Sequence, residues 1–180
     1  MAPFAIELEK IRTKKNLVNL EPALNSFGSM LLVADEEEEP GIHEWVTKTR
    51  AKMSAEERAR HKLVIIGLHY AVLPRRASTS FEAYLAELES SPPSQLRERL
   101  LKAYSTICMT DKAKEDASKP VDWDKVLLSP KNYVNFLLHR FGDELTDQEM
   151  EAQAYQYVID PVAMKQLITG HMRWFWENHL

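Results

Sequence analysis

The stretch Leu63-Val64-Ile65-Ile66-Gly67-Leu68-His69-Tyr70-Ala71-Val72-Leu73 is apolar on nearly every side of a helix. A helix without a polar face is stable only when other elements cover it all round. We therefore expect this stretch to lie at the centre of the fold, with Leu68 in the core. His69 is the one polar residue that interrupts it.

Sequence signals on either side of this stretch set the bounds of the central helix. Ser54 and Glu57 have the spacing of a capping box, in which each side chain accepts a hydrogen bond from the other residue's backbone N–H. Pro74 ends the helix because proline cannot continue it. The prediction is one helix that begins after Ser54 and ends at about Leu73.

Prolines mark where further helices begin. A proline at the first helical position loses no hydrogen bond, and a preceding Ser or Asp can cap the free amides. The five glycines of the chain leave few positions for tight hairpins. We therefore predict an all-α fold, an irregular bundle of about seven to eight helices. The proline starts are Glu21-Pro22, Ser91-Pro92-Pro93, Ser129-Pro130 and Asp160-Pro161.

The expected helices can be given by residue range. They cover about 22–34, 45–53, 81–88, 93–107, 122–127, 130–141, 146–158 and 161–180. Gly142 is expected to close the helix that ends at Phe141, and Ser80 to cap the one that begins at Phe81. The charged stretch 110–120 is predicted to be a flexible loop within one domain.

The first 19 residues are expected to form an arm and linker, and residues 20–180 a single helical domain. Phe4, Ile6 and Leu8 alternate with small or charged residues, which is the period of an extended strand. The basic stretch 10–15 then favours an exposed linker, and the acidic run 35–39 a solvated turn after the first helix.

Composition and charge exclude several classes of function. The chain has 180 residues, of which 44% are hydrophobic, and its formal net charge is −4. Without a basic surplus there is little counterion release to drive binding to phosphates, so we expect no direct binding of nucleic acid. The longest apolar run is too short to span a bilayer, so no membrane partner is expected. One cysteine, Cys108, favours a reducing, cytoplasmic location.

Catalytic and metal-binding motifs are missing from the sequence. No Gly-x-Ser-x-Gly turn and no phosphate-cradling glycine loop occurs. His61 and His69 lie eight residues apart, as do His171 and His179, which is roughly 12 Å along a helix and too far to share one metal. We therefore expect no enzyme, no cofactor and no metal site.

A small-molecule site, if the domain has one, is predicted at Trp45, His69 and Tyr70. These residues supply polar and aromatic groups where other elements meet the central helix, and ligand pockets are mostly apolar with a few orienting polar groups. The alternative interpretation is structural, because a core histidine commonly pairs with a carbonyl and an aromatic side chain at a helix start commonly anchors a core.

Two tryptophans near the C-terminus are predicted interface residues. Trp174 and Trp176 lie about 100° to either side of Phe175 on a helix, so one core is not expected to cover both. We expect the last helix to be cut short at Leu180 and Trp176 to pack on a missing downstream segment or on a second copy. The expected assembly is a homodimer.

Three stretches resemble the N-terminal helical regulatory region of bacterial ArsR-like winged-helix transcriptional regulators. Residues 20–31 (LEPALNSFGSML) are similar to its opening helix, and His43-Glu44-Trp45 to the start of its second helix. Residues 81–88 (FEAYLAEL), 91–93 (SPP) and 96–100 (LRERL) are similar to its short helix, proline break and next helix. Asp160-Pro161 and residues 174–177 (WFWE) fit the helix that leads toward the DNA-binding half.

This resemblance implies a regulatory domain that senses a small-molecule ligand of unidentified class, dimerises, or does both. Its state would reach the DNA reader through the last helix, and the winged-helix part is not in this chain. Metal sensing of the ArsR type is not implied, because the cysteine or histidine clusters for it are missing. A stand-alone helical interaction module is the alternative, and an enzyme with a helical active site is the third hypothesis.

Overall fold

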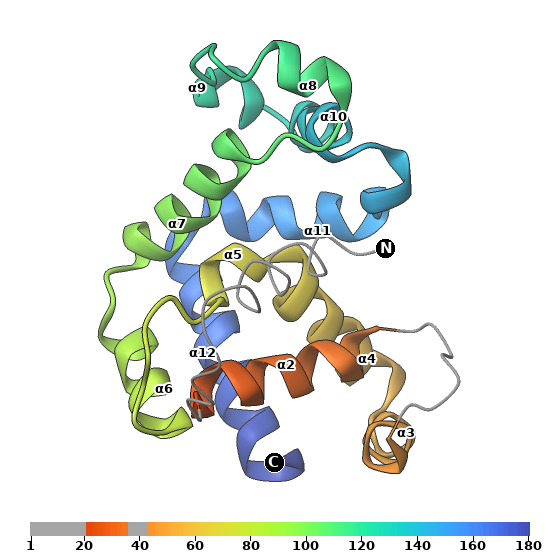
Figure 1. Ribbon diagram of the computed structural model, residues 1–180, viewed down its shortest axis with the longest axis vertical. Coiled ribbons are helices and arrows are strands. Elements are labelled where there is room, and N and C mark those ends of the chain that lie inside the picture. Colours follow the sequence, from red (N-terminus) through yellow and green to blue (C-terminus); the bar gives the residue numbers. More distant parts are fainter. Residues whose placement is uncertain (1–20, 36–42) are drawn as a thin grey trace, which may run out of the picture.

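The computed structural model describes residues 21–35 and 43–180, and all secondary structure in these two ranges is helical (Figure 1). This confirms the all-α prediction. The predicted arm at Phe4 to Glu9, the basic linker and most of the acidic run lie outside the described residues.

The two ranges contain eleven α-helices, one π-helical turn and one 3-10 turn. The eight helices of seven residues or more are α2 (Pro22–Ala34), α3 (Glu44–Lys52), α4 (Ala55–Lys62), α6 (Phe81–Ser90), α7 (Pro93–Thr106), α10 (Pro130–Phe141), α11 (Gln148–Ile159) and α12 (Pro161–His179). The short elements are η1 (Leu63–Gly67), α5 (His69–Val72), α8 (Asp111–Glu115), α9 (Trp123–Val126) and η2 (Asp143–Leu145).

Local capping chemistry sets these bounds, as the sequence predicted. The Ser54 side chain accepts from the Glu57 amide at 3.2 Å, and the Glu57 carboxylate accepts from the Ser54 amide at 2.7 Å. Ser129 caps α10, which begins at Pro130, and Gly142 ends α10 with a φ of 85° that favours glycine. The loop predicted over 110–120 needs correction, because Thr110 caps the short helix α8 inside it.

The central segment is not one continuous α-helix. Between α4 and α5 it forms the π-helical turn η1, in which the Leu68 amide donates to the Leu63 carbonyl at 3.0 Å. Leu68 itself has φ −108° and ψ 21°, outside the α-helical region. The widened turn leaves the Gly67 carbonyl to accept a hydrogen bond from the Tyr104 hydroxyl of α7 at 3.2 Å. Apolar periodicity carries no sign of such a turn.

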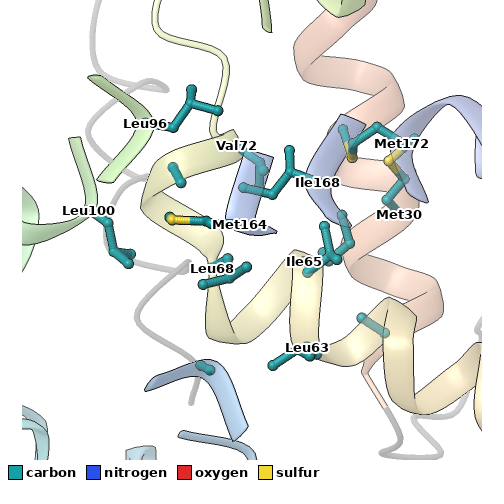
Figure 2. Packing of buried hydrophobic residues seen from close by; sticks show 14 of the residues in the cluster. Met30, Leu63, Ile65, Leu68, Val72, Leu96, Leu100, Met164, Ile168 and Met172 are labelled. Carbon is teal, nitrogen blue, oxygen red and sulfur yellow. The ribbon is translucent and has the colours of Figure 1, made fainter. Parts of the chain in front are cut away.

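The core covers most of this central segment, but Ile66, Tyr70 and Leu73, which share one face, are only partly buried. Helices α2, α11 and α12 pack on η1, and α7 packs on α5. Leu68 and Ile65 are completely buried, beside Met164 and Ile168 of α12 (Figure 2). Full burial of one such leucine stabilises the fold by roughly 1.5–3 kcal/mol.

Helices α8 and α9 form a separate lobe that packs mainly on α10, away from α2, α3 and α6 (Figure 1). Helix α10 packs on α11, and α11 packs in turn on α12 and η1. The lobe is therefore connected to the central segment and to the C-terminal helix through two intervening helices.

Candidate functional site

The three residues of the predicted ligand site are not gathered around one cavity. His69 and Tyr70 are neighbours whose rings are 4.9 Å apart, edge to face. Trp45 lies elsewhere, at the end of α12, where its indole N–H donates to the His179 carbonyl at 3.3 Å. The two best-formed hollows of the described residues have none of the three in their lining.

The surroundings of His69 agree with the structural interpretation given above. Its Nδ1 lies 3.3 Å from the Ile65 carbonyl, one turn earlier, and its ring packs 5.2 Å from that of Phe27. Burial lowers the pKa of His69 to about 3, so the imidazole is neutral at physiological pH. A ligand role for these three residues stays a prediction.

Two histidines that are distant in the sequence lie in contact in the core. His61 of α4 and His171 of α12 are 110 residues apart, yet His61 Nδ1 lies 2.8 Å from His171 Nε2. His61 Nε2 lies 2.8 Å from the Met30 carbonyl of α2. Both imidazoles are buried, and the ring of His61 stacks on Phe175 at 4.4 Å. The pair therefore joins three helices through side-chain hydrogen bonds.

The Met30 carbonyl fixes the tautomers of this pair. A carbonyl oxygen only accepts, so His61 Nε2 must carry the proton and His61 Nδ1 must be the acceptor. His171 Nε2 then donates to it, which leaves His171 Nδ1 as a buried acceptor with no hydrogen-bond partner in the described part of the chain. Burial lowers the pKa of His61 to about 4 and that of His171 to about 3.

Both C-terminal tryptophans pack on residues of the same chain, whereas the sequence predicted that Trp176 packs on a downstream segment or on a second copy. Trp176 stacks on Phe81 of α6, with ring centroids 4.6 Å apart, and is half-buried. Trp174 is also half-buried and packs against His171 and His179. Helix α6 thus covers part of the Trp176 face of α12, which the helical periodicity predicted to be exposed. An interface role for either tryptophan stays a prediction.

An acidic side chain lies buried on α11, the helix that packs on the π-helical turn. Glu151 of α11 is 8% exposed, and its Oε2 has no hydrogen-bond partner among the described residues. Burial raises the pKa of Glu151 to about 8, and the charge of Asp147 adds to the effect. The carboxyl is therefore mostly protonated at neutral pH. Its position one helical turn before Tyr155, on an apolar stripe, is the sequence signal that could have revealed it.

The lobe and α10 border an open hollow of about 220 Å³ on the surface. Its apolar lining comes from Phe136 and from residues 120, 121 and 126, and its charged lining is Asp116, Lys119, Asp122, Lys125, His139 and Arg140. A second hollow of about 280 Å³ lies between α6, α7 and the Arg75-Arg76 segment. There Arg99 already lies 3.6 Å from the Glu87 carboxylate, so its charge is compensated.

Arg140 distinguishes the first hollow, because its guanidinium is buried and no carboxylate of residues 21–35 or 43–180 is bonded to it. The residue is 4% exposed, and its Nη1 donates to the Cys108 sulfur at 2.6 Å. Its Nε has no hydrogen-bond partner in the described ranges, and its charge lies 5.4 Å from the centre of the Phe136 ring. A buried guanidinium normally pairs with an anion, since its desolvation is costly.

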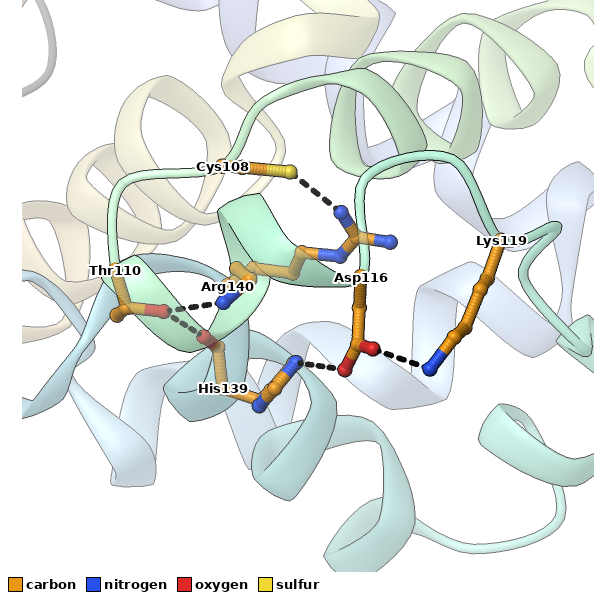
Figure 3. A network of polar contacts seen from close by, with 7 residues as sticks. Cys108, Thr110, Asp116, Lys119, His139 and Arg140 are labelled. Carbon is orange, nitrogen blue, oxygen red and sulfur yellow. Dashed lines mark hydrogen bonds and ion pairs between the residues drawn. The ribbon is translucent and has the colours of Figure 1, made fainter.

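The neighbouring polar groups are already engaged with one another (Figure 3). Asp116 accepts from Lys119 at 2.7 Å and lies 3.4 Å from His139 Nε2. Thr110 donates to the His139 carbonyl at 2.6 Å, and the backbone amides of Met109 and Thr110 donate to the Arg140 carbonyl. These bonds hold the lobe on the C-terminal end of α10 and leave the Arg140 guanidinium with spare hydrogen-bonding capacity.

The sequence-based prediction did not include Arg140, although this residue lies on the apolar face of its helix. It follows Leu137 by three positions and Tyr133 by seven, so it continues a buried stripe. A charged residue on such a stripe is a signal that sequence alone supplies. The cysteine that faces it comes from the loop after α7 and could not be paired with it in advance.

Comparison with models of known families, with curated proteins and with solved structures gives no match for this chain. The resemblance to ArsR-like regulators therefore stays a prediction. Within residues 21–35 and 43–180, no helix is long and apolar enough to cross a bilayer. The same residues contain no cluster of three or more His, Cys, Asp or Glu arranged to hold a metal ion.

Proposed function

We propose that the chain is a regulatory domain that senses a small molecule in the hollow between the lobe and α10. The observation that carries this proposal is the buried guanidinium of Arg140, which lines this hollow and is bonded to no carboxylate in the described part of the chain. Polar groups that converge on a concave site are the usual mark of ligand binding.

Attachment of the lobe supports a sensing role. Because α8 and α9 pack mainly on α10, a change in the position of the lobe would mainly alter its contacts with this one helix. A ligand held between α10 and the lobe would add contacts on both sides of the hollow. Such a ligand stabilises one arrangement of the lobe over others, which is the requirement for regulation by population shift.

The output proposed for this domain is α12. Helix α10 packs on α11, and α11 packs on α12, so the lobe and the C-terminal helix share a continuous series of packed elements. A response at α12 to a ligand of the hollow is therefore the measurement that tests this coupling. A transcriptional regulator with an ArsR-like arrangement would use its last helix in this way.

Hydrogen exchange on the full chain tests the proposal. The probes are butyrate, inorganic phosphate, butan-1-ol and butylamine, each at matched ionic strength. We expect at least one probe to slow amide exchange in residues 108–128 and also to change exchange in α12. Binding that alters the lobe and leaves α12 unchanged would contradict a sensing function, as would failure of all four probes to affect the lobe.

Homodimer formation is part of the proposal and rests on α12. Trp174 and Trp176 remain half-buried after packing within the chain, so each retains aromatic surface that a partner could cover. Analytical ultracentrifugation should give twice the mass of the 20.8 kDa chain, and Trp174→Ala should shift the protein toward monomer. A wild type that is still monomeric at about 100 µM, where a dimer of micromolar affinity would be populated, would refute this part.

A further inference from the structure

We propose that the ligand of the hollow between the lobe and α10 is a small organic monocarboxylate, bound by Arg140 and Lys125. This inference rests on the proposed function, because it names the ligand class of the same site. It follows from three properties of the hollow, namely the unsatisfied guanidinium, the balance of charge around it and its size and apolar wall.

The guanidinium of Arg140 supplies the anchor. Within the described part of the chain, only Nη1 of its three nitrogens has a hydrogen-bond partner, the Cys108 sulfur. A thiol sulfur is a weak acceptor and carries no compensating charge in its neutral form. A carboxylate fits the planar fork of arginine and compensates its charge, and such charge-assisted hydrogen bonds are stronger than neutral ones.

The charge around the hollow favours a monoanion. Three cations, Lys119, Lys125 and Arg140, face two carboxylates, Asp116 and Asp122, which leaves a surplus of one positive charge among these five groups. Asp116 is already paired with Lys119. A phosphate dianion would exceed this surplus and be repelled by the two carboxylates, whereas a carboxylate matches it.

The size and wall of the hollow favour a short apolar group on the carboxylate. The hollow, at about 220 Å³, is smaller than pockets for drug-sized ligands, whose volumes begin at roughly 300 Å³. Phe136 and Val126 form part of its apolar wall, and the Phe136 ring also packs against Trp123 of α9 at 5.2 Å. An alkyl or aryl group would contact these side chains and so bridge α10 and the lobe.

Isothermal titration of the full chain with butyrate tests the inference. We expect butyrate to bind, with butan-1-ol and butylamine at least tenfold weaker because they lack the carboxylate, and inorganic phosphate also weaker. Lys125→Ala should weaken butyrate binding about two- to fivefold, as expected for an exposed charge. The matched control is Lys131→Ala, which removes an exposed lysine of α10 outside the hollow.

Arg140→Lys keeps the charge and removes the planar fork, so butyrate binding should weaken about ten- to a hundredfold. Because Arg140 is buried, binding to Arg140→Lys is compared only after its circular dichroism and melting temperature match those of the wild type. Lys125 is exposed, so Lys125→Ala tests the site without this folding control. In the wild type, butyrate should also shift the side-chain Nε–H resonance of Arg140. Equal binding of butyrate and butan-1-ol, or an equal effect of Lys125→Ala and Lys131→Ala, would overturn the inference.

The results separate this inference from the proposed function. If butyrate binds at Arg140 and α12 does not respond, the ligand class stands and sensing is refuted. If phosphate or a neutral probe binds in the hollow and α12 responds, sensing stands and the monocarboxylate is refuted.

Discussion

Replacement of Glu151 by glutamine should remove a pH dependence that the buried carboxyl imposes on folding. In the native protein burial raises the pKa of Glu151 to about 8, against 4.5 for an ordinary glutamate. Between these two values the native state holds a proton that the unfolded state has released. The stability that Glu151 contributes is therefore fully present below pH 4.5 and is lost as the pH rises through 8.

The size of this effect follows from the pKa difference. Each unit corresponds to about 1.4 kcal/mol, so the raised pKa of Glu151 accounts for roughly 5 kcal/mol between pH 4.5 and pH 8. A domain of this kind has a total stability of about 5–15 kcal/mol, so the loss is a large fraction. Glutamine has nearly the same shape and does not ionise, so Glu151→Gln should gain stability over the wild type as the pH rises.

Urea unfolding followed by circular dichroism at pH 5, 6, 7 and 8 measures this difference. Taking the wild type and Glu151→Gln at each pH cancels the titration of all other groups, including the buried histidines. The control is Glu149→Gln on the same helix, where the side chain is exposed. A difference between Glu151→Gln and the wild type that stays constant from pH 5 to pH 8 would refute the reasoning.

Three further predictions concern the core. Leu68→Asp should unfold the domain, because an unpaired charge at a fully buried position costs several kcal/mol. The control Leu128→Asp, at a position that is 76% exposed, should melt like the wild type. Cooperative melting of Leu68→Asp would count against the burial of Leu68. The pKa values of His61 and His171 are depressed, so the stability that they contribute is present above pH 6.5 and is lost as the pH falls toward 4. The double variant His61→Leu/His171→Leu should show a smaller fall in urea midpoint between pH 6.5 and pH 4.5, and an unchanged fall would disprove the assignment. Gly67→Ala should stabilise the domain by roughly 0.4–1 kcal/mol, because alanine reduces the conformational entropy of the unfolded chain. The added methyl fits, since it would meet its nearest neighbours at 3.4–3.6 Å, which is ordinary contact. A lower melting temperature would show that the π-helical turn requires glycine.

The sequence by itself determined most of the helices and their bounds, with the π-helical turn η1 and the short helix α8 as exceptions. Pro22, Pro130 and Pro161 each stand at the start of a helix, and Gly142 ends one, because capping depends on residues within a turn of each other. The apolar run around Leu68 identified the centre of the core for a related reason, since a side chain's preference for water or burial is a property of the residue itself.

Only the tertiary structure decided which distant residues meet. His61 contacts His171 across 110 residues, and Trp176 stacks on Phe81 rather than facing outward. Arg140 reaches the sulfur of Cys108 and so defines the candidate site. These contacts depend on how helices pack against one another, and packing is set by the fit of whole surfaces, which local periodicity does not encode.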